Sequence, residues 1–137
     1  MSSTAFFVMA KPDALKRGLL GEIISRFEKR GFVLKTLKTL LPEDFKDVMD
    51  MHYGEHKEKS FYDKLIEFST SGKICAMIWY GNIDVARKLV GATIPSEALP
   101  GTIRGDYSCS LPNNLIHCSD SPENALRELS LWAKLLY

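Results

Sequence analysis

The sequence predicts a single α+β domain, in which helices separate the strands of one small sheet. Four short apolar stretches have the composition of strands, and segments with helical periodicity lie between them. This order fits either a parallel α/β sheet or a split βαβ arrangement. Because the strands are few and the chain has only 137 residues, the split βαβ arrangement is favoured.

The composition is that of one globular domain over residues 1–137. Hydrophobic residues make up 45% of the chain and charged residues 26%, which are ordinary values for a soluble protein. The net charge of +1 offers no strong field for nucleic acid or membrane, and the apolar runs are too short to span a bilayer. Three cysteines without framework spacing, Cys75, Cys109 and Cys118, predict reduced thiols and a cytoplasmic location.

The first half of the chain alternates strands with helical segments. Residues 5–10 (AFFVMA) are continuously apolar, which predicts a central strand buried on both faces. Pro12 ends this strand and leaves Lys11 at its tip. Apolar residues at helical spacing predict a helix over 19–30. The irregular stretch 32–41 is interrupted by lysines, which predicts a strand near a sheet edge.

The second half continues this alternation. The predicted helical segments are 43–57, 60–68, 83–90 and 121–133. Residues 74–79 (ICAMIW) predict another buried strand, and residues 114–118 predict the last strand. Residues 91–106 contain several prolines and glycines and are predicted to form a long ordered loop. Loops of this length are usually functional.

A histidine, His117, stands at the end of the last predicted strand and beside the start of the last helix. Ser121 is a good N-cap, and Pro122 suits the first helical position. Neutral imidazole is a nucleophile near pH 7, and a helix N-terminus favours negative charge. His117 is therefore a candidate nucleophile toward an anionic substrate, and a purely structural histidine is the alternative.

Phosphate groups, if the protein binds them, must be held by side chains. The glycine-rich patterns GxxxxGK[ST] and GxGxxG are both absent from the sequence. Lys11, Arg87 and Arg104 are the candidate phosphate ligands, because they stand at element ends or in the long loop. Each alone is more often a solvated cation, whereas three cations that converge on one histidine would indicate a phosphate site.

One short motif competes with this interpretation. The run His52-Tyr53-Gly54-Glu55-His56 fits the HxxEH pattern of one class of zinc peptidases. On a helix the two histidines would share a face and could bind zinc, with the glutamate as base. The glycine weakens such a helix, so a mostly solvated helix face is the favoured interpretation.

Residues 114–121 (NLIHCSDS) resemble the active-site signature N-[IL]-I-H-[GA]-S-D-S of nucleoside diphosphate kinases. Further stretches resemble this family in the same order: VMAKPD at 8–13, RGLLGEII at 17–24, HY at 52–53, FY at 61–62, GAT at 91–93 and PGTIRGD at 100–106. The similarity extends from about residue 5 to residue 132. It implies a ferredoxin-like (βαββαβ) fold with a four-stranded antiparallel sheet, helices packed on it and a long ordered loop before the last strand.

The resemblance also implies a ping-pong phosphotransferase. The γ-phosphate of a nucleoside triphosphate, typically ATP, would pass to His117 and then to a nucleoside diphosphate. Glu128 would orient the histidine ring, and Ser119 would support both residues. Asn114 and Lys11 would hold the sugar hydroxyls, and Phe61 would stack on the base. The side chains expected around the phosphates are Lys11, Tyr53, Arg87, Thr93 and Arg104. Mg²⁺ would be held mainly through the phosphates.

The sequence departs from the family pattern at a few positions. Cys118 replaces the usual glycine or alanine, and Pro112-Asn113 replaces a Gly-Arg pair. The segment before residue 91 is slightly shorter than usual, which affects the alignment of Arg87. Because side chains alternate along a strand, Cys118 is expected to point away from the site and into the core.

The family resemblance further implies a homo-oligomer, with a hexamer favoured and a tetramer possible. A regulatory or nucleic-acid-binding module of the same fold is the alternative function. The near-zero net charge argues against strong nucleic-acid binding.

Overall fold

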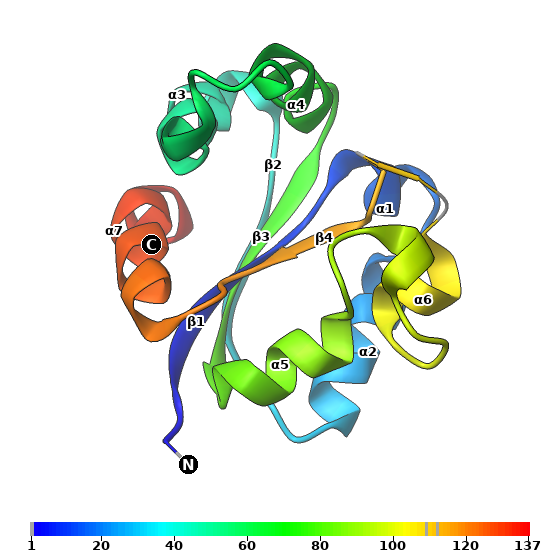
Figure 1. Cartoon of the computed structure of the whole chain (residues 1–137). Helices are drawn as coiled ribbons and strands as arrows, with labels where there is room; N and C mark the ends of the chain where they lie inside the picture. Colours follow the sequence, from blue (N-terminus) through cyan, green and yellow to red (C-terminus); the bar gives the residue numbers. More distant parts are fainter. Residues whose placement is uncertain (1, 109, 112) are drawn as a thin grey trace.

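The computed structural model describes residues 2–108, 110–111 and 113–137 (Figure 1). Met1, Cys109 and Pro112 lie outside the described residues. The expectations that Cys109 is a reduced thiol and that Pro112 replaces a family glycine therefore lie outside them as well. The strands are β1 (Thr4–Ala10), β2 (Val33–Leu40), β3 (Ile74–Gly81) and β4 (Ile116–Cys118). They form one antiparallel sheet in the order β2-β3-β1-β4. This is the split βαβ order of a ferredoxin-like α+β fold, as predicted.

Helices cover both faces of this sheet (Figure 1). They are α1 (Pro12–Lys16), α2 (Leu20–Lys29), α3 (Pro42–His52), α4 (Tyr62–Ser69), α5 (Ile83–Val90), α6 (Ile103–Tyr107) and α7 (Pro122–Leu136), with 3₁₀ turns η1 (Gly54–His56) and η2 (Pro95–Glu97). Helices α3, α4 and α7 pack on the face that carries Phe7 and Met9. Helices α2 and α5 pack on the face that carries Phe6 and Val8. Within the part of the chain that is described, no helix is long and apolar enough to cross a membrane.

The burial of each strand explains its sequence pattern. β1 lies between β3 and β4, and its side chains from Phe6 to Ala10 are fully buried on alternate faces. A continuous apolar run is the sequence that such a position requires. β2 lies at the sheet edge and leaves Val33 and Leu37 exposed. The central position predicted for residues 5–10 and the edge position predicted for residues 32–41 are both confirmed.

Helix α7, which carries Glu128, begins where the sequence indicates. The Ser121 hydroxyl accepts a hydrogen bond from the Asn124 amide at 3.1 Å, and Pro122 takes the first helical position of α7. These contacts satisfy an otherwise unpaired N–H at the helix start. The start of α7 is thereby fixed close behind β4.

Several predicted segments differ from the structure. The helix expected over 43–57 ends at His52, and a separate 3₁₀ turn, η1, follows at Gly54. Glycine is a poor helix former, which accounts for the break. The loop expected over 91–106 contains α6, whose start is capped by the Thr102 hydroxyl. The short helix α1, which directly follows β1, was not predicted from the sequence.

The last strand is also shorter than predicted, because it begins at Ile116 instead of residue 114. Leu115 has a φ of 71°, in the left-handed region that a leucine rarely adopts. Its amide donates to Asp13 Oδ2 at 3.1 Å, and its carbonyl accepts from the Lys11 amide at 2.8 Å. Lys11 and Asp13, at the start of α1, therefore hold a sharp bend two residues before His117.

Candidate active site

One cavity of about 660 Å³ collects nearly all the side chains that the sequence singles out. The predicted residues that line it are Lys11, Tyr53, Phe61, Arg87, Thr93, Arg104, Asn114, His117 and Glu128. Ser119 does not line the cavity, but it contacts Glu128 from behind. The cavity lies where the loops after β1 and before β4 meet α3, α5 and α7. Segments far apart in the sequence therefore converge on one site.

Strand register determines where His117 points. His117 stands opposite Met9 of β1, so its ring faces the side of the sheet that α3 and α7 cover. Cys118 stands opposite Val8 and points to the other face. Cys118 is 2% exposed, and burial raises the pKa of its thiol to about 12. The expectation that Cys118 lies in the core is confirmed.

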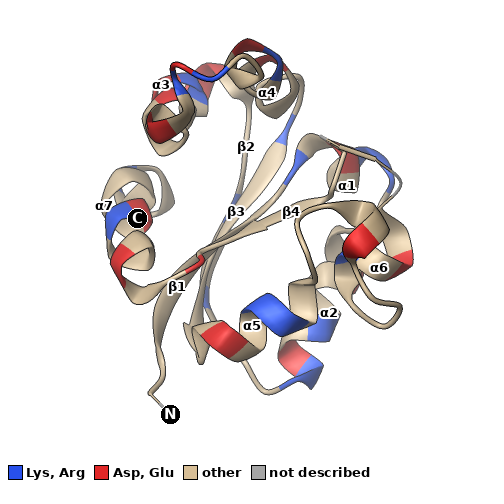
Figure 2. Cartoon of the chain, viewed as in Figure 1, with Lys and Arg blue, Asp and Glu red and all other residues tan. Residues whose placement is uncertain are grey.

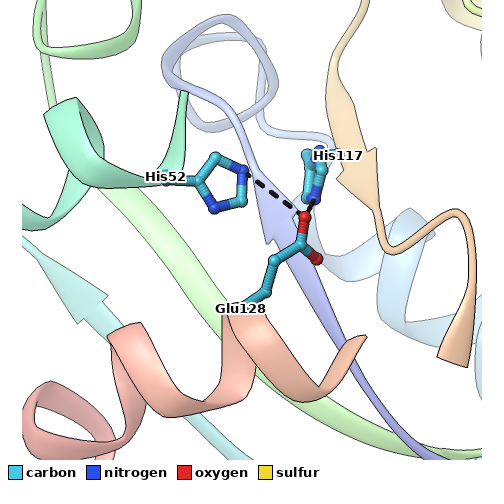
Figure 3. Close-up of side chains that lie close together, drawn as sticks. All are labelled: His52, His117 and Glu128. Atoms are coloured by element: carbon cyan, nitrogen blue, oxygen red, sulfur yellow. Dashed lines mark hydrogen bonds and ion pairs between the residues drawn. The ribbon is translucent and has the colours of Figure 1, made fainter. Parts of the chain in front are cut away.

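A buried carboxylate holds one nitrogen of the His117 ring (Figure 3). Nε2 of His117 lies 2.9 Å from Oε2 of Glu128, a residue of α7. The other carboxylate oxygen, Oε1, accepts from the Ser119 hydroxyl at 2.6 Å, and that hydroxyl accepts from the Phe7 amide at 3.0 Å. The residues that the structure describes form no hydrogen bond to Nδ1 of His117. The ring is thus fixed on one side, and its second nitrogen is left available.

Two buried cations stand beside the histidine. The Arg104 guanidinium is 4% exposed and donates to the carbonyl oxygens of Asn114, Gly91 and Ile116. These contacts position the guanidinium without neutralising its charge. The Lys11 ammonium donates to Asn114 Oδ1 at 2.7 Å.

The electrostatics of these cations favour an anion. Burial, and next the charge of Arg104, lower the pKa of Lys11 to about 7, although Asp13 opposes the shift. Burial and the nearby Arg87 lower the pKa of Arg104 to about 10. Both shifts come first from burial and next from a neighbouring cation, and the Asp13 carboxylate offsets the shift at Lys11 only in part. A bound phosphate would supply the missing negative charge.

The remaining predicted residues surround the mouth and walls of the cavity. Arg87 of α5 donates to the Cys118 carbonyl at 3.3 Å, so the slightly short segment before it still brings it to the site. The Asn114 side-chain amide donates to the Thr93 carbonyl at 3.1 Å, which ties the long loop to the segment before β4. Phe61 is 47% exposed and lines the cavity. The exposed Leu111 also lines it, although the sequence did not indicate this residue as part of the site.

The alternative zinc motif is not formed. His52 is the last residue of α3, whereas Glu55 and His56 belong to η1, so the single helix face that the motif needs is broken. The expected solvated face holds for Glu55 but not for His52, which is 2% exposed and accepts a hydrogen bond from the Trp132 indole at 3.1 Å. Burial, and next the charge of His117, lower the pKa of His52 well below its usual value.

His52 instead joins His117 and Glu128. The described residues contain one group of three potential metal ligands within 4.8 Å of one another, and it consists of these three side chains. Nε2 of His52 lies 3.9 Å from Oε2 of Glu128. No spacing in the sequence links His52 to Trp132 or Glu128, so this contact could not be predicted.

The comparisons with known proteins agree with this site. Residues 4–135 match the family model described as Nucleoside diphosphate kinase. Curated relatives include the nucleoside diphosphate kinases of Schizosaccharomyces pombe, 49% identical over 134 residues (96% of this chain, 87% of the relative), and of an Exiguobacterium species, 52% identical over 128 residues (92% and 91%). Among solved structures, the apo enzyme of Encephalitozoon cuniculi has a TM-score of 0.88 at 42% identity (93% of this chain, 87% of that chain). The Halobacterium salinarum enzyme in complex with CDP has a TM-score of 0.87 at 40% identity (96% and 88%).

Proposed function

Because the chain belongs to the nucleoside diphosphate kinase family, whose members transfer phosphoryl groups between nucleotides, we propose that His117 carries the phosphoryl group in this reaction. The observation that supports this role best is the contact of 2.9 Å between Nε2 of His117 and the buried Glu128 carboxylate. It leaves Nδ1 as the nitrogen that attacks. The three cations predicted from the sequence line the same cavity.

The reaction proceeds in two matched halves. In the first, Nδ1 of His117 forms a bond to the γ-phosphorus, the bond from this phosphorus to the β-phosphate oxygen breaks, and the nucleoside diphosphate leaves. In the second, a β-phosphate oxygen of another nucleoside diphosphate takes the phosphoryl group from Nδ1. Glu128 fixes the proton on Nε2 and stabilises the positive charge that the ring gains on phosphorylation. Ser119 keeps the carboxylate in place.

The cavity supplies donors for the charge that the transferring phosphoryl group spreads over its oxygens. Arg87 and Arg104 offer planar guanidinium groups, and Lys11 offers an ammonium. Burial raises the pKa of the Tyr53 hydroxyl, so this group stays protonated and donates to a phosphate oxygen. Thr93 completes the set from the long loop.

The nucleoside occupies the outer part of the cavity. Asn114 and Lys11, which are hydrogen-bonded to each other, hold the sugar hydroxyls. Phe61 stacks on the base, and Leu111 offers a second apolar surface at the mouth. The relative solved with CDP supports a nucleoside diphosphate as the ligand of this site. Because any base can stack on an aromatic ring, the site should accept several bases.

A divalent cation accompanies the reaction in this family, and we propose that it is Mg²⁺. Among the described residues, the one three-residue group of potential ligands contains two imidazole nitrogens, whereas Mg²⁺ prefers oxygen. The phosphate oxygens of the nucleotide are therefore its main ligands. Glu55 and Asp120 line the cavity and are available to its bound waters. When bound, Mg²⁺ would neutralise part of the phosphate charge.

We infer that the protein is a cytoplasmic homo-oligomer, with a hexamer favoured and a tetramer possible. The edge strand β2 exposes Val33 and Leu37, which supports self-association through this strand. Cys75 and Cys118 are free, buried thiols, as expected in a reducing compartment. Figure 2 shows basic and acidic residues interspersed on the same helices, which does not favour the alternative of strong nucleic-acid binding.

Two-substrate kinetics test the proposal. Initial rates should give parallel lines in double-reciprocal plots when donor and acceptor are varied, as in a ping-pong mechanism. His117→Ala should abolish turnover while its circular dichroism and unfolding midpoint stay close to those of the unmodified enzyme. Intersecting lines, or appreciable turnover by folded His117→Ala, would show that His117 does not carry the phosphoryl group.

A further inference from the structure

A buried imidazole outside the proposed mechanism lies against the proposed nucleophile. His52 ends α3, and Figure 3 shows its ring directed toward Glu128 from the side opposite the sheet strand that bears His117. The Trp132 indole N–H donates to Nδ1 of His52 at 3.1 Å. Indole is a donor only, so Nδ1 must carry a lone pair. A neutral His52 therefore has its proton on Nε2.

That proton faces the carboxylate that holds the nucleophile. Nε2 of His52 lies 3.9 Å from Oε2 of Glu128, the same oxygen that lies 2.9 Å from Nε2 of His117. The two imidazole rings meet edge to face, with centroids 4.5 Å apart and planes at 81°. His52 thus presents an N–H dipole to the carboxylate and a flat wall to the neighbouring ring.

The surroundings of His52 keep it in place and uncharged. Arg127 of α7 donates to the carbonyl oxygens of Met51 and His52 at 2.8 and 3.0 Å, which ties the end of α3 to α7. Burial and the nearby His117, Arg127 and Lys11 all lower the pKa of His52. A neutral His52 does not compete with the phosphorylated His117 ring for the negative charge of Glu128.

We propose that His52 is a positioning residue for phosphoryl transfer, which acts through Glu128. Trp132 fixes the tautomer of His52, and His52 holds the Glu128 carboxylate and the His117 ring in the orientation that leaves Nδ1 free. Glu128 and Trp132 are four residues apart on α7, so they lie on one face of this helix. From this face Glu128 contacts His117, and Trp132 contacts His52. This inference rests on the proposed role of His117.

The same geometry disfavours a transition-metal site at His52, His117 and Glu128. A metal would need the lone pair of Nε2 of His52, where the hydrogen bond from Trp132 places the proton. Binding would require either loss of that proton or rupture of the contact with Trp132. The positioning role needs neither change.

Matched variants of His52 test the proposal. The Asn oxygen can replace Nδ1 as acceptor for Trp132, so His52→Asn keeps that contact and removes the donor toward Glu128 together with the imidazole ring. The Gln amide can replace Nε2, so His52→Gln keeps that donor. We expect His52→Asn to lower kcat about tenfold or more at nearly unchanged KM, because a misplaced reacting group costs up to about 10²-fold. His52→Gln should recover most of this loss.

A double-mutant cycle separates positioning from a merely structural role. If His52 acts through Glu128, His52→Asn should lower kcat much less in a Glu128→Gln background than in the unmodified enzyme. An equal loss in both backgrounds would overturn the proposal. So would equal losses in folded His52→Asn and His52→Gln.

A measurement on the unmodified enzyme covers the case in which the variants do not fold. Nitrogen-15 NMR of labelled histidines should show His52 neutral between pH 6 and pH 8, protonated on Nε2 and unprotonated on Nδ1. The other tautomer, or a charged ring, would overturn the proposal. Phosphoryl labelling of His117 is measured in parallel. Absence of label from the unmodified enzyme would refute the proposed role of His117. A labelling rate in His52→Asn equal to that of the unmodified enzyme would refute only the positioning role of His52.

Discussion

Nucleotide binding should be accompanied by proton uptake at Lys11. The pKa of Lys11 is lowered to about 7, first by burial and then by Arg104. A group with this pKa is protonated in about half of the molecules at pH 7 and in about a tenth at pH 8. A phosphate beside Lys11 favours the ammonium form. Binding at pH 8 should therefore take up about 0.9 proton, and binding at pH 7 about 0.5.

Calorimetry measures this uptake directly. A nucleoside diphosphate is titrated into the enzyme at pH 8 in two buffers that differ in ionisation enthalpy, and the difference in binding enthalpy gives the number of protons. The second phosphate pKa is about 6, so the ligand is already ionised at pH 8. Lys11→Arg is the matched control, because arginine stays charged at this pH. Equal binding enthalpies in both buffers for the unmodified enzyme, or equal uptake by Lys11→Arg, would refute the reasoning.

Three further predictions concern individual side chains of the site. Glu128→Gln should slow phosphoryl transfer by about 10²–10⁴, the range typical of a lost acid–base group, in single-turnover assays; an unchanged rate would exclude its orienting role. Phe61→Ala should weaken the binding of all common nucleotides alike, by about 1–3 kcal/mol, whereas selective weakening of one base would reveal a specific contact. Cys118→Ala should keep most activity, and native Cys118 should resist iodoacetamide because its thiol is buried with a raised pKa. Peptide mapping that found Cys118 alkylated, with activity lost in parallel, would contradict this.

Strong local patterns made much of the fold predictable. The apolar runs at 5–10 and 74–79 lie in the two central strands, because only a strand covered on both faces needs such a sequence. Ser121 and Pro122 mark the start of α7 for the same local reason. Helices of only one or two turns, such as α6, were not predicted, because five residues show no helical periodicity.

Parts of the site depend on contacts that no local pattern reveals. The bend at Leu115 is held by Asp13, which is 102 residues away in the sequence. The tautomer of His52 depends on Trp132, which is 80 residues away. The lowered pKa of Lys11 requires both burial and Arg104. The sequence could identify which residues belong to the site, but the state of each group is set by its neighbours in space.

The position of the phosphoryl group on the enzyme tests the mechanism most directly. The enzyme is incubated with γ-labelled ATP without acceptor and denatured in alkali, and its phosphohistidine is assigned by peptide mapping and by phosphorus NMR against standards of both ring isomers. Because Glu128 occupies Nε2, the label should lie on Nδ1 of His117 and should pass to added nucleoside diphosphate. Label on Nε2, on another residue, or on no residue would contradict the mechanism.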